Sequence, residues 1–130
     1  MDLSPGDVIL LFDQLTTPPK TKWFCCVCVA ENWFLRINSL PRRHGQNQLI
    51  EHSKNFFLSH NSHIDLLGVI AVHPDQVLNA IANPFAYKGR LAMATMIELA
   101  RNISASRTIP PRQKKMILAE LSRVGIVTSD

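Results

Sequence analysis

The clearest strand signal in this chain is the stretch Trp23-Phe24-Cys25-Cys26-Val27-Cys28-Val29, in which every residue is apolar. Aromatic and β-branched side chains favour extended structure. A second stretch, Trp33-Phe34-Leu35-Arg36-Ile37-Asn38, follows after Glu31-Asn32. Asn tolerates positive φ in a turn, so we expect a two-residue hairpin at Glu31-Asn32 that pairs the two stretches as antiparallel strands.

Strand signals fill the first half of the chain and helix signals fill the second half. An almost continuous apolar run at Val8–Phe12 predicts a first strand covered on both faces, and Leu66–Val72 predicts a later strand. Ser39 to Gln48 is predicted as a polar loop, and Thr16-Thr17-Pro18-Pro19 as an irregular one. Strands followed by helices indicate an α+β fold, because a parallel sheet would alternate the two.

Three helices are predicted in the second half. A short one begins at Pro74-Asp75 and ends before Pro84. The next has apolar residues at helical spacing, namely Met93, Ile97, Ala100 and Ile103. The last begins at Pro110-Pro111 and ends at Gly125, with an apolar stripe of Ile117, Leu121 and Val124.

Length and composition predict one globular domain over residues 1–130, strand-rich at 6–72 and helical at 74–125. The chain has 130 residues, of which 46% are hydrophobic, and this proportion argues against disorder. The apolar stretches are far shorter than the roughly 18–20 residues that span a bilayer. The acidic segment Met1–Asp7 does not resemble a secretory signal, so we expect a cytoplasmic protein.

Cysteine usage agrees with a reducing compartment. Cys25, Cys26 and Cys28 lie within one strand, where neighbouring side chains point to opposite faces and cannot pair without distortion. We expect reduced, buried thiols, and the alternative is a reactive or metal-binding role.

Basic residues concentrate in the last fifty residues. Residues 1–80 contain six Lys or Arg and seven Asp or Glu, whereas residues 81–130 contain eight and three. A smaller basic cluster lies between Lys20 and Lys54. Such surfaces attract nucleic acid, although a solvated face with no such partner is the alternative. The start of the last helix, where the helix dipole is already positive, carries three cations: Arg112, Lys114 and Lys115. Either a docked anion or solvent screening would offset this electrostatic repulsion.

The candidate chemistry lies in the segment that holds all five histidines: His44, His52, His60, His63 and His73. His60-x-x-His63 is the nearest approach to a metal motif, but a third ligand is not evident and we expect no metal or other cofactor. His63 and Asp65 would share a strand face and could transfer protons when RNA is cleaved by its own 2′-hydroxyl. Alternatively, Asp65 caps a turn and His63 is merely exposed.

Three short segments, in order along the chain, resemble the PemK/MazF family of toxins. Gly6-Asp7-Val8-Ile9-Leu10 is similar to the first strand of that family. Ser62-His63-Ile64-Asp65-Leu66 resembles its Ser-x-Val-Asp-Leu segment, and Gly89-Arg90-Leu91 resembles the Gly-x-Leu that opens its terminal helix.

This resemblance implies a small antiparallel SH3-like β-barrel of the PemK/MazF/CcdB type, with C-terminal helices packed on it, usually as a homodimer. It also implies metal-independent cleavage of single-stranded RNA and an antitoxin peptide that blocks the RNA groove. Asp65 falls on a position that holds a catalytic Asp in some members, and His63 falls where those members have Arg. Lys20-Thr21-Lys22-Trp23 replaces the family's Arg-Pro at the start of the second strand.

We therefore expect a toxin-type endoribonuclease with a catalytic set of His63, Asp65 and Arg42. In this hypothesis Arg42 or Lys22 holds the scissile phosphate, and a base stacks on an exposed Trp33. Further nucleic-acid contacts are expected from basic side chains in the loops and the last helix: Lys20, Lys22, Arg43, Arg112, Lys114 and Lys115. The alternative function is a non-catalytic PemK-like module that binds nucleic acid or a protein partner.

Overall fold

The central hairpin joins β2 (Lys20–Cys28) to β3 (Trp33–Asn38) in the computed structural model, which describes residues 2–13, 17–43 and 45–127. Asn32 has a φ of 53°, as its place in a turn predicts. The predicted two-residue turn is wrong, because four residues separate the strands and the Asn32 amide donates to the Val29 carbonyl. Thr16 and His44 lie outside the described residues.

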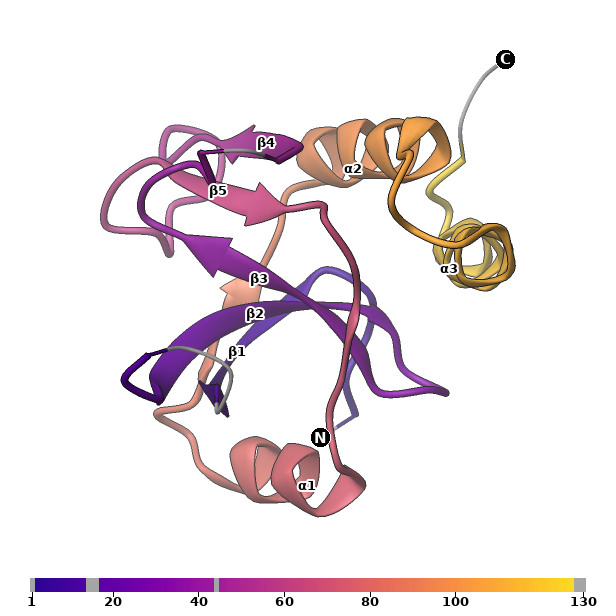
Figure 1. Cartoon of the computed structure of the whole chain (residues 1–130). Coiled ribbons are helices and arrows are strands. Elements are labelled where there is room, and N and C mark those ends of the chain that lie inside the picture. Colours follow the sequence, from indigo (N-terminus) through magenta and orange to yellow (C-terminus); the bar gives the residue numbers. More distant parts are fainter. Residues whose placement is uncertain (1, 14–16, 44, 128–130) are drawn as a thin grey trace.

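In the described part of the chain, seven antiparallel strands form one curled sheet around this hairpin (Figure 1), so the α+β prediction is confirmed. Beside β2 lies β1 (Asp7–Asp13), followed by β7 (Tyr87–Arg90) at one edge. Beside β3 lies β5 (Ser62–Asp65), followed by β4 (Asn47–Ile50) at the other edge. The two-residue strand β6 (Ile70–Ala71) pairs with the start of β3.

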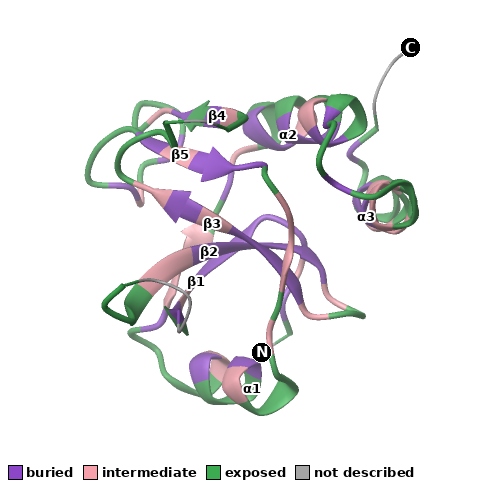
Figure 2. Ribbon diagram, viewed as in Figure 1, coloured by how far each residue is buried: buried purple, intermediate pink, exposed green. Residues whose placement is uncertain are grey.

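Hydrophobic cores lie on both faces of the curled sheet. One contains Val8 and packs against α2 (Met93–Ala105) and α3 (Pro111–Arg123); the other contains Ile9 and Leu11 and packs against α1 (Pro74–Ala82). Figure 1 shows α1 apart from the other two helices, and Figure 2 shows that the strands between them are largely buried. The prediction that the first strand is covered on both faces is therefore confirmed for Val8, Ile9 and Leu11, whereas Phe12 at its end is 50% exposed.

All three cysteines are buried free thiols, as predicted. Burial raises the pKa of Cys25 to about 12, and it also raises the pKa values of Cys26 and Cys28. These thiols stay protonated at neutral pH, which suits a role as core side chains.

Three strand segments and one helix face differ from the sequence predictions. Of the strand predicted at Leu66–Val72 only Ile70–Ala71 forms, as β6, because Asp65 Oδ1 accepts from the Leu67 amide at 2.9 Å and turns the chain after β5. Gly89-Arg90-Leu91 does not open a helix, since Gly89 lies in β7 opposite Val8. The segment Ser39 to Gln48 contains the start of β4. On α2, Met93 is 54% exposed, and the buried stripe instead contains Thr95, Met96, Leu99, Ala100 and Ile103.

Candidate functional site

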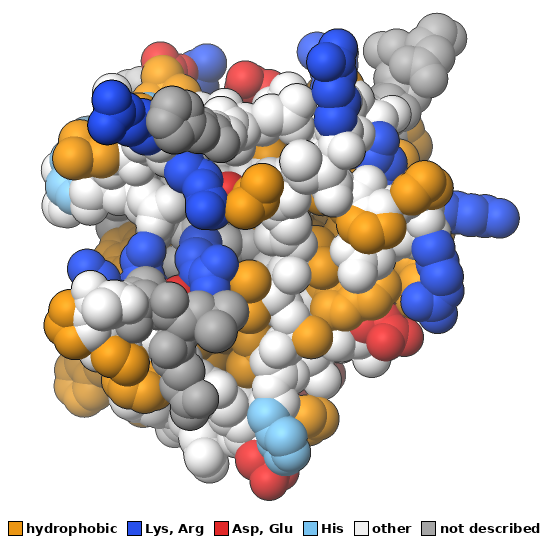
Figure 3. Space-filling model, in the orientation of Figure 1, with side chains coloured by type: hydrophobic (Ala, Val, Ile, Leu, Met, Phe, Trp, Pro, Cys, Tyr) orange, Lys and Arg blue, Asp and Glu red, His pale blue; other side chains and the backbone are white. Residues whose placement is uncertain are grey.

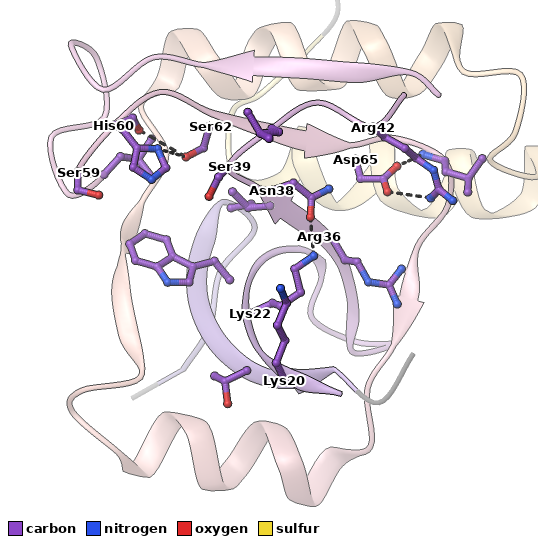
Figure 4. Close-up of a pocket in the computed structure, with 16 residues that line it drawn as sticks. Lys20, Lys22, Arg36, Asn38, Ser39, Arg42, Ser59, His60, Ser62 and Asp65 are labelled. Atoms are coloured by element: carbon purple, nitrogen blue, oxygen red, sulfur yellow. Dashed lines mark hydrogen bonds and ion pairs between the residues drawn. The ribbon is translucent and has the colours of Figure 1, made fainter. Parts of the chain in front are cut away.

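A groove of about 1050 Å³ lies where the ends of β2, β3 and β5 meet the chain segments 39–42 and 58–60. Figure 4 shows that its labelled polar side chains come from all of these elements, and Figure 3 shows blue basic side chains gathered on this part of the surface. The groove is lined by Lys20, Thr21, Lys22, Trp23, Arg36, Ile37, Asn38, Ser39, Leu40, Arg42, Leu58, Ser59, His60, Ser62, Asp65 and Leu67.

Cations from β2 and β3 form one side of the groove. Lys22 Nζ donates to Asn38 Oδ1 at 2.6 Å, and burial lowers the pKa of this lysine. Arg36 pairs with Asp13 through bonds of 2.5 and 3.1 Å, so Asp13 compensates its charge. Lys20 is exposed at the groove. Lys20 and Lys22 therefore give this wall a positive charge that a polyanion would meet.

Arg42 and Asp65 form an ion pair at the other end of the lining, with 3.1 Å between Nη1 and Oδ2 (Figure 4). The Asp65 side chain is 7% exposed and the Arg42 side chain 44%. Oδ1 of Asp65 also caps the turn at Leu67, so the alternative in which this carboxylate caps a turn is confirmed, and its proton transfer with His63 stays a hypothesis. Asp65 thereby directs the Arg42 guanidinium at the groove.

The structure places His60, rather than His63, in the groove. His63 lies in β5 with Asp65, paired in register with Leu49 and Asn38, and it is not among the described residues that line the groove. His60 lies on the loop before β5, with Nδ1 2.8 Å from the Asn61 carbonyl and 3.5 Å from Ser62 Oγ. A carbonyl can only accept, so in the neutral form of the ring Nδ1 is the donor and the lone pair lies on Nε2.

Trp23 lines the groove, whereas Trp33 does not. Trp33 is 7% exposed within the core, so the prediction that it offers an exposed stacking face is wrong. A register shift between Cys26 and Cys28 accompanies its pairing with Cys28. Trp23 is half-buried, stacks on Phe57 with ring centroids 6.3 Å apart, and has the Lys88 ammonium 5.6 Å from its ring centre. Its place at the polar start of the apolar run was the signal for a partly exposed aromatic residue.

The remaining predicted nucleic-acid contacts lie outside this lining. Arg43 is exposed beside Arg42. Arg112 and Lys115 are exposed on α3, and Lys114 Nζ donates to the Ser104 carbonyl at 3.1 Å. In Figure 3, basic side chains also gather near α2 and α3, away from the groove. The structure thus separates two basic regions.

The described residues contain neither a metal-binding cluster nor a membrane-spanning helix. No group of three or more His, Cys, Asp or Glu side chains there could hold a metal ion, so His60 and His63 have no third ligand among them. No helix in the described ranges has the length and apolar character needed to cross a membrane. Comparison with protein-family models, curated proteins and solved structures finds no match to this chain.

Proposed function

We propose that the groove binds single-stranded RNA and that the protein cleaves it without a metal, as a toxin-type endoribonuclease does. One observation supports the proposal: basic side chains, the Trp23 ring and the His60 imidazole all line a single groove. Its volume of about 1050 Å³ is large for a small-molecule site and suits an extended ligand. We also propose that the curled sheet is a small barrel of the SH3-like type.

Phosphate and base binding fall to different residues in this proposal. Arg42 offers a planar fork of N–H donors to a phosphate, and Lys20 and Lys22 supply further positive charge. The part of the Trp23 ring that Phe57 and Lys88 leave exposed is the surface for stacking of a base, an interaction that tolerates any base sequence. A duplex hides its base faces, so this combination favours a single strand.

His60 is the proton acceptor in the proposed reaction. Its Nε2 takes the proton of the ribose 2′-hydroxyl, whose oxygen attacks the adjacent phosphorus. The new O2′–P bond forms as the P–O5′ bond breaks, which leaves a 2′,3′-cyclic phosphate and a 5′-hydroxyl. Lys22, whose pKa is lowered by burial, gives the proton to O5′. Arg42 stabilises the charge that develops on the phosphoryl oxygens, while Asp65 keeps its ion pair.

A cleavage assay on labelled single-stranded RNA in excess EDTA tests this assignment. General acid–base catalysis contributes about 10²–10⁴-fold, so His60→Ala should lower the rate by at least about 100-fold. His63→Ala is the matched control, because it removes an imidazole that lies outside the groove lining, and it should retain activity. Loss of activity with EDTA, or an active His60→Ala, contradicts the proposal. In cells, wild-type expression should arrest growth and His60→Ala should relieve the arrest.

A non-catalytic RNA-binding module is the second candidate, and it is favoured by one specific observation. Both carboxylate oxygens of Asp65 are already engaged, by Arg42 and by the Leu67 amide, and His63 lies outside the lining. Binding without cleavage would favour this candidate over the nuclease.

Salt dependence tests the binding step common to both candidates. If Lys20, Lys22 and Arg42 contact phosphates, log K should fall with log salt at a slope of about −2, since each contact adds about −0.7. Lys20→Ala should flatten the slope by about 0.7, whereas Lys115→Ala on α3 should leave it unchanged. An equal effect at Lys115 would show that RNA binds over the helices, and a flat response would indicate a protein partner.

A further inference from the structure

We infer that Asn47 is the positioning residue that fixes Arg42 in the groove, an inference that rests on the proposed function. Arg42 lies outside the strands, and its side chain is partly exposed. A long side chain on a loop would lose much rotamer freedom on binding a phosphate. Its geometry in the free protein therefore depends on contacts that hold the loop in place.

The Asn47 side chain holds the loop through both its amide oxygen and its amide nitrogen. Its Oδ1 accepts from the Arg42 amide at 2.9 Å, and its Nδ2 donates to the Arg42 carbonyl at 3.0 Å. Nδ2 also donates to the Gly45 carbonyl at 3.2 Å. Both backbone polar groups of Arg42 are thus bound by one side chain, as a strand partner would bind them.

The sheet register places Asn47 beside Asp65, the residue that binds the Arg42 guanidinium. Asn47 of β4 pairs directly with Asp65 of β5, whose carboxylate binds the Arg42 guanidinium. Gly45 permits the close turn, because a Cβ there would lie 3.0 Å from Arg42 Cδ. Arg42 is therefore held at its backbone and at its guanidinium by cross-strand neighbours.

The next residue anchors this part of β4 to a helix. Gln48 is almost fully buried, and its Nε2 donates to the Thr95 carbonyl on α2 at 3.1 Å. Its Oε1 accepts from Asn102 Nδ2 at 3.0 Å. Because α2 holds Gln48, the adjacent Asn47 is a fixed support rather than part of a mobile loop.

The substitution Asn47→Ala tests the inference. It should lower the rate of RNA cleavage by about 100-fold, the scale of loss when a reacting group shifts by about 1 Å. If the protein binds RNA without cutting it, the same variant should weaken binding to a labelled single strand. Asn47→Asp keeps the acceptor but loses both donations, so its effect should be intermediate. Asn83→Ala is the matched control, since Asn83 Oδ1 accepts the Phe85 amide at 3.0 Å away from the groove lining.

A double-mutant cycle separates positioning from a general structural role. If Asn47 acts through Arg42, Asn47→Ala should have no further effect in an Arg42→Ala background, whereas a structural role would lower activity in both. Full additivity would overturn the inference.

An RNA-free measurement keeps this test independent of the proposed function. Solvent exchange of the Arg42 guanidinium protons, followed by NMR, should be slow in the wild type and at least about tenfold faster in Asn47→Ala, because the Asp65 bond is then held less often. Unchanged exchange would overturn the positioning role even if RNA is cleaved. Faster exchange in a protein that neither binds nor cleaves RNA would reject the proposed function alone.

Discussion

Trp23 and Trp33, the two tryptophans of the chain, give a direct optical test of the groove. Trp33→Phe leaves Trp23 as the sole tryptophan, in the groove lining and half-buried. The substitution keeps an aromatic ring in the core, so it should cost less than the ~3–5 kcal/mol of truncation to Ala. Addition of a single-stranded RNA oligonucleotide should quench the fluorescence of this variant. Trp23→Phe keeps only the buried Trp33, and its fluorescence should not change.

The same site predicts a loss of affinity. Stacking of a base on an aromatic side chain is worth about 1–3 kcal/mol by alanine substitution, which corresponds to about a 5- to 150-fold rise in Kd for Trp23→Ala. Fluorescence anisotropy of a labelled oligonucleotide measures this change, and urea unfolding checks that the variant is folded. Unchanged Kd in a folded Trp23→Ala, or quenching of Trp33 alone, would refute the stacking role.

Three further predictions concern stability, each measured by urea unfolding. Asp7→Ala should lower the free energy of unfolding by about 2–4 kcal/mol. The substitution removes a fully buried carboxylate that binds the Ser4 amide, Tyr87 and Arg90. The control is Asp75→Ala at an exposed position, which should change the free energy of unfolding by less than about 0.5 kcal/mol. Gly89→Ala should lower the free energy of unfolding by about 1–3 kcal/mol, because Gly89 has a φ of 151° and the added Cβ would lie 2.7 Å from the Phe57 ring. The control is Gly68→Ala, whose added Cβ would have no neighbouring atom within 4 Å. Burial raises the pKa of Cys25 from 9.0 to about 12, so the folded state keeps a proton that the unfolded chain loses. The contribution of this thiol to stability should be constant below pH 9 and then fall by about 1.4 kcal/mol per pH unit until about pH 12, and Cys25→Ala should remove that part of the slope.

The central hairpin and the three helices could be predicted because local patterns determine them. The apolar run from Trp23 and the helical spacing of Ile117 and Leu121 each mark an element through residues close in sequence. The edge strands β4 and β7 gave no such signal, because each is four residues long and contains several polar residues. Their pairing depends on partners far along the chain, which no local pattern records.

The candidate site was predicted in part, for a similar reason. The sequence predicted that Arg42, Arg43, Lys20 and Lys22 lie in loops that close over His63 and Asp65. The groove contains Arg42, Lys20, Lys22 and Asp65, but Lys20 and Lys22 lie in β2 rather than in a loop, and Arg43 and His63 are not in the lining. Period-two alternation tells which residues share a strand face, but it does not tell which end of the strand meets a groove. Choosing between Trp23 and Trp33, or between His60 and His63, required the curl of the sheet and the turn after Asp65.

The hydrogen bonds from Asp7 to Tyr87 and Arg90 also bear on when the sheet can be completed during synthesis. They join residues 80 and 83 positions apart, so the first strand has only one completed side until about ninety residues have been synthesised. Contacts of such long sequence separation form slowly because a large loop must close first. During synthesis, an emerging chain of eighty residues would present an unpaired edge of β1 and an Asp7 carboxylate that lacks Tyr87 and Arg90, and β7 would complete the sheet.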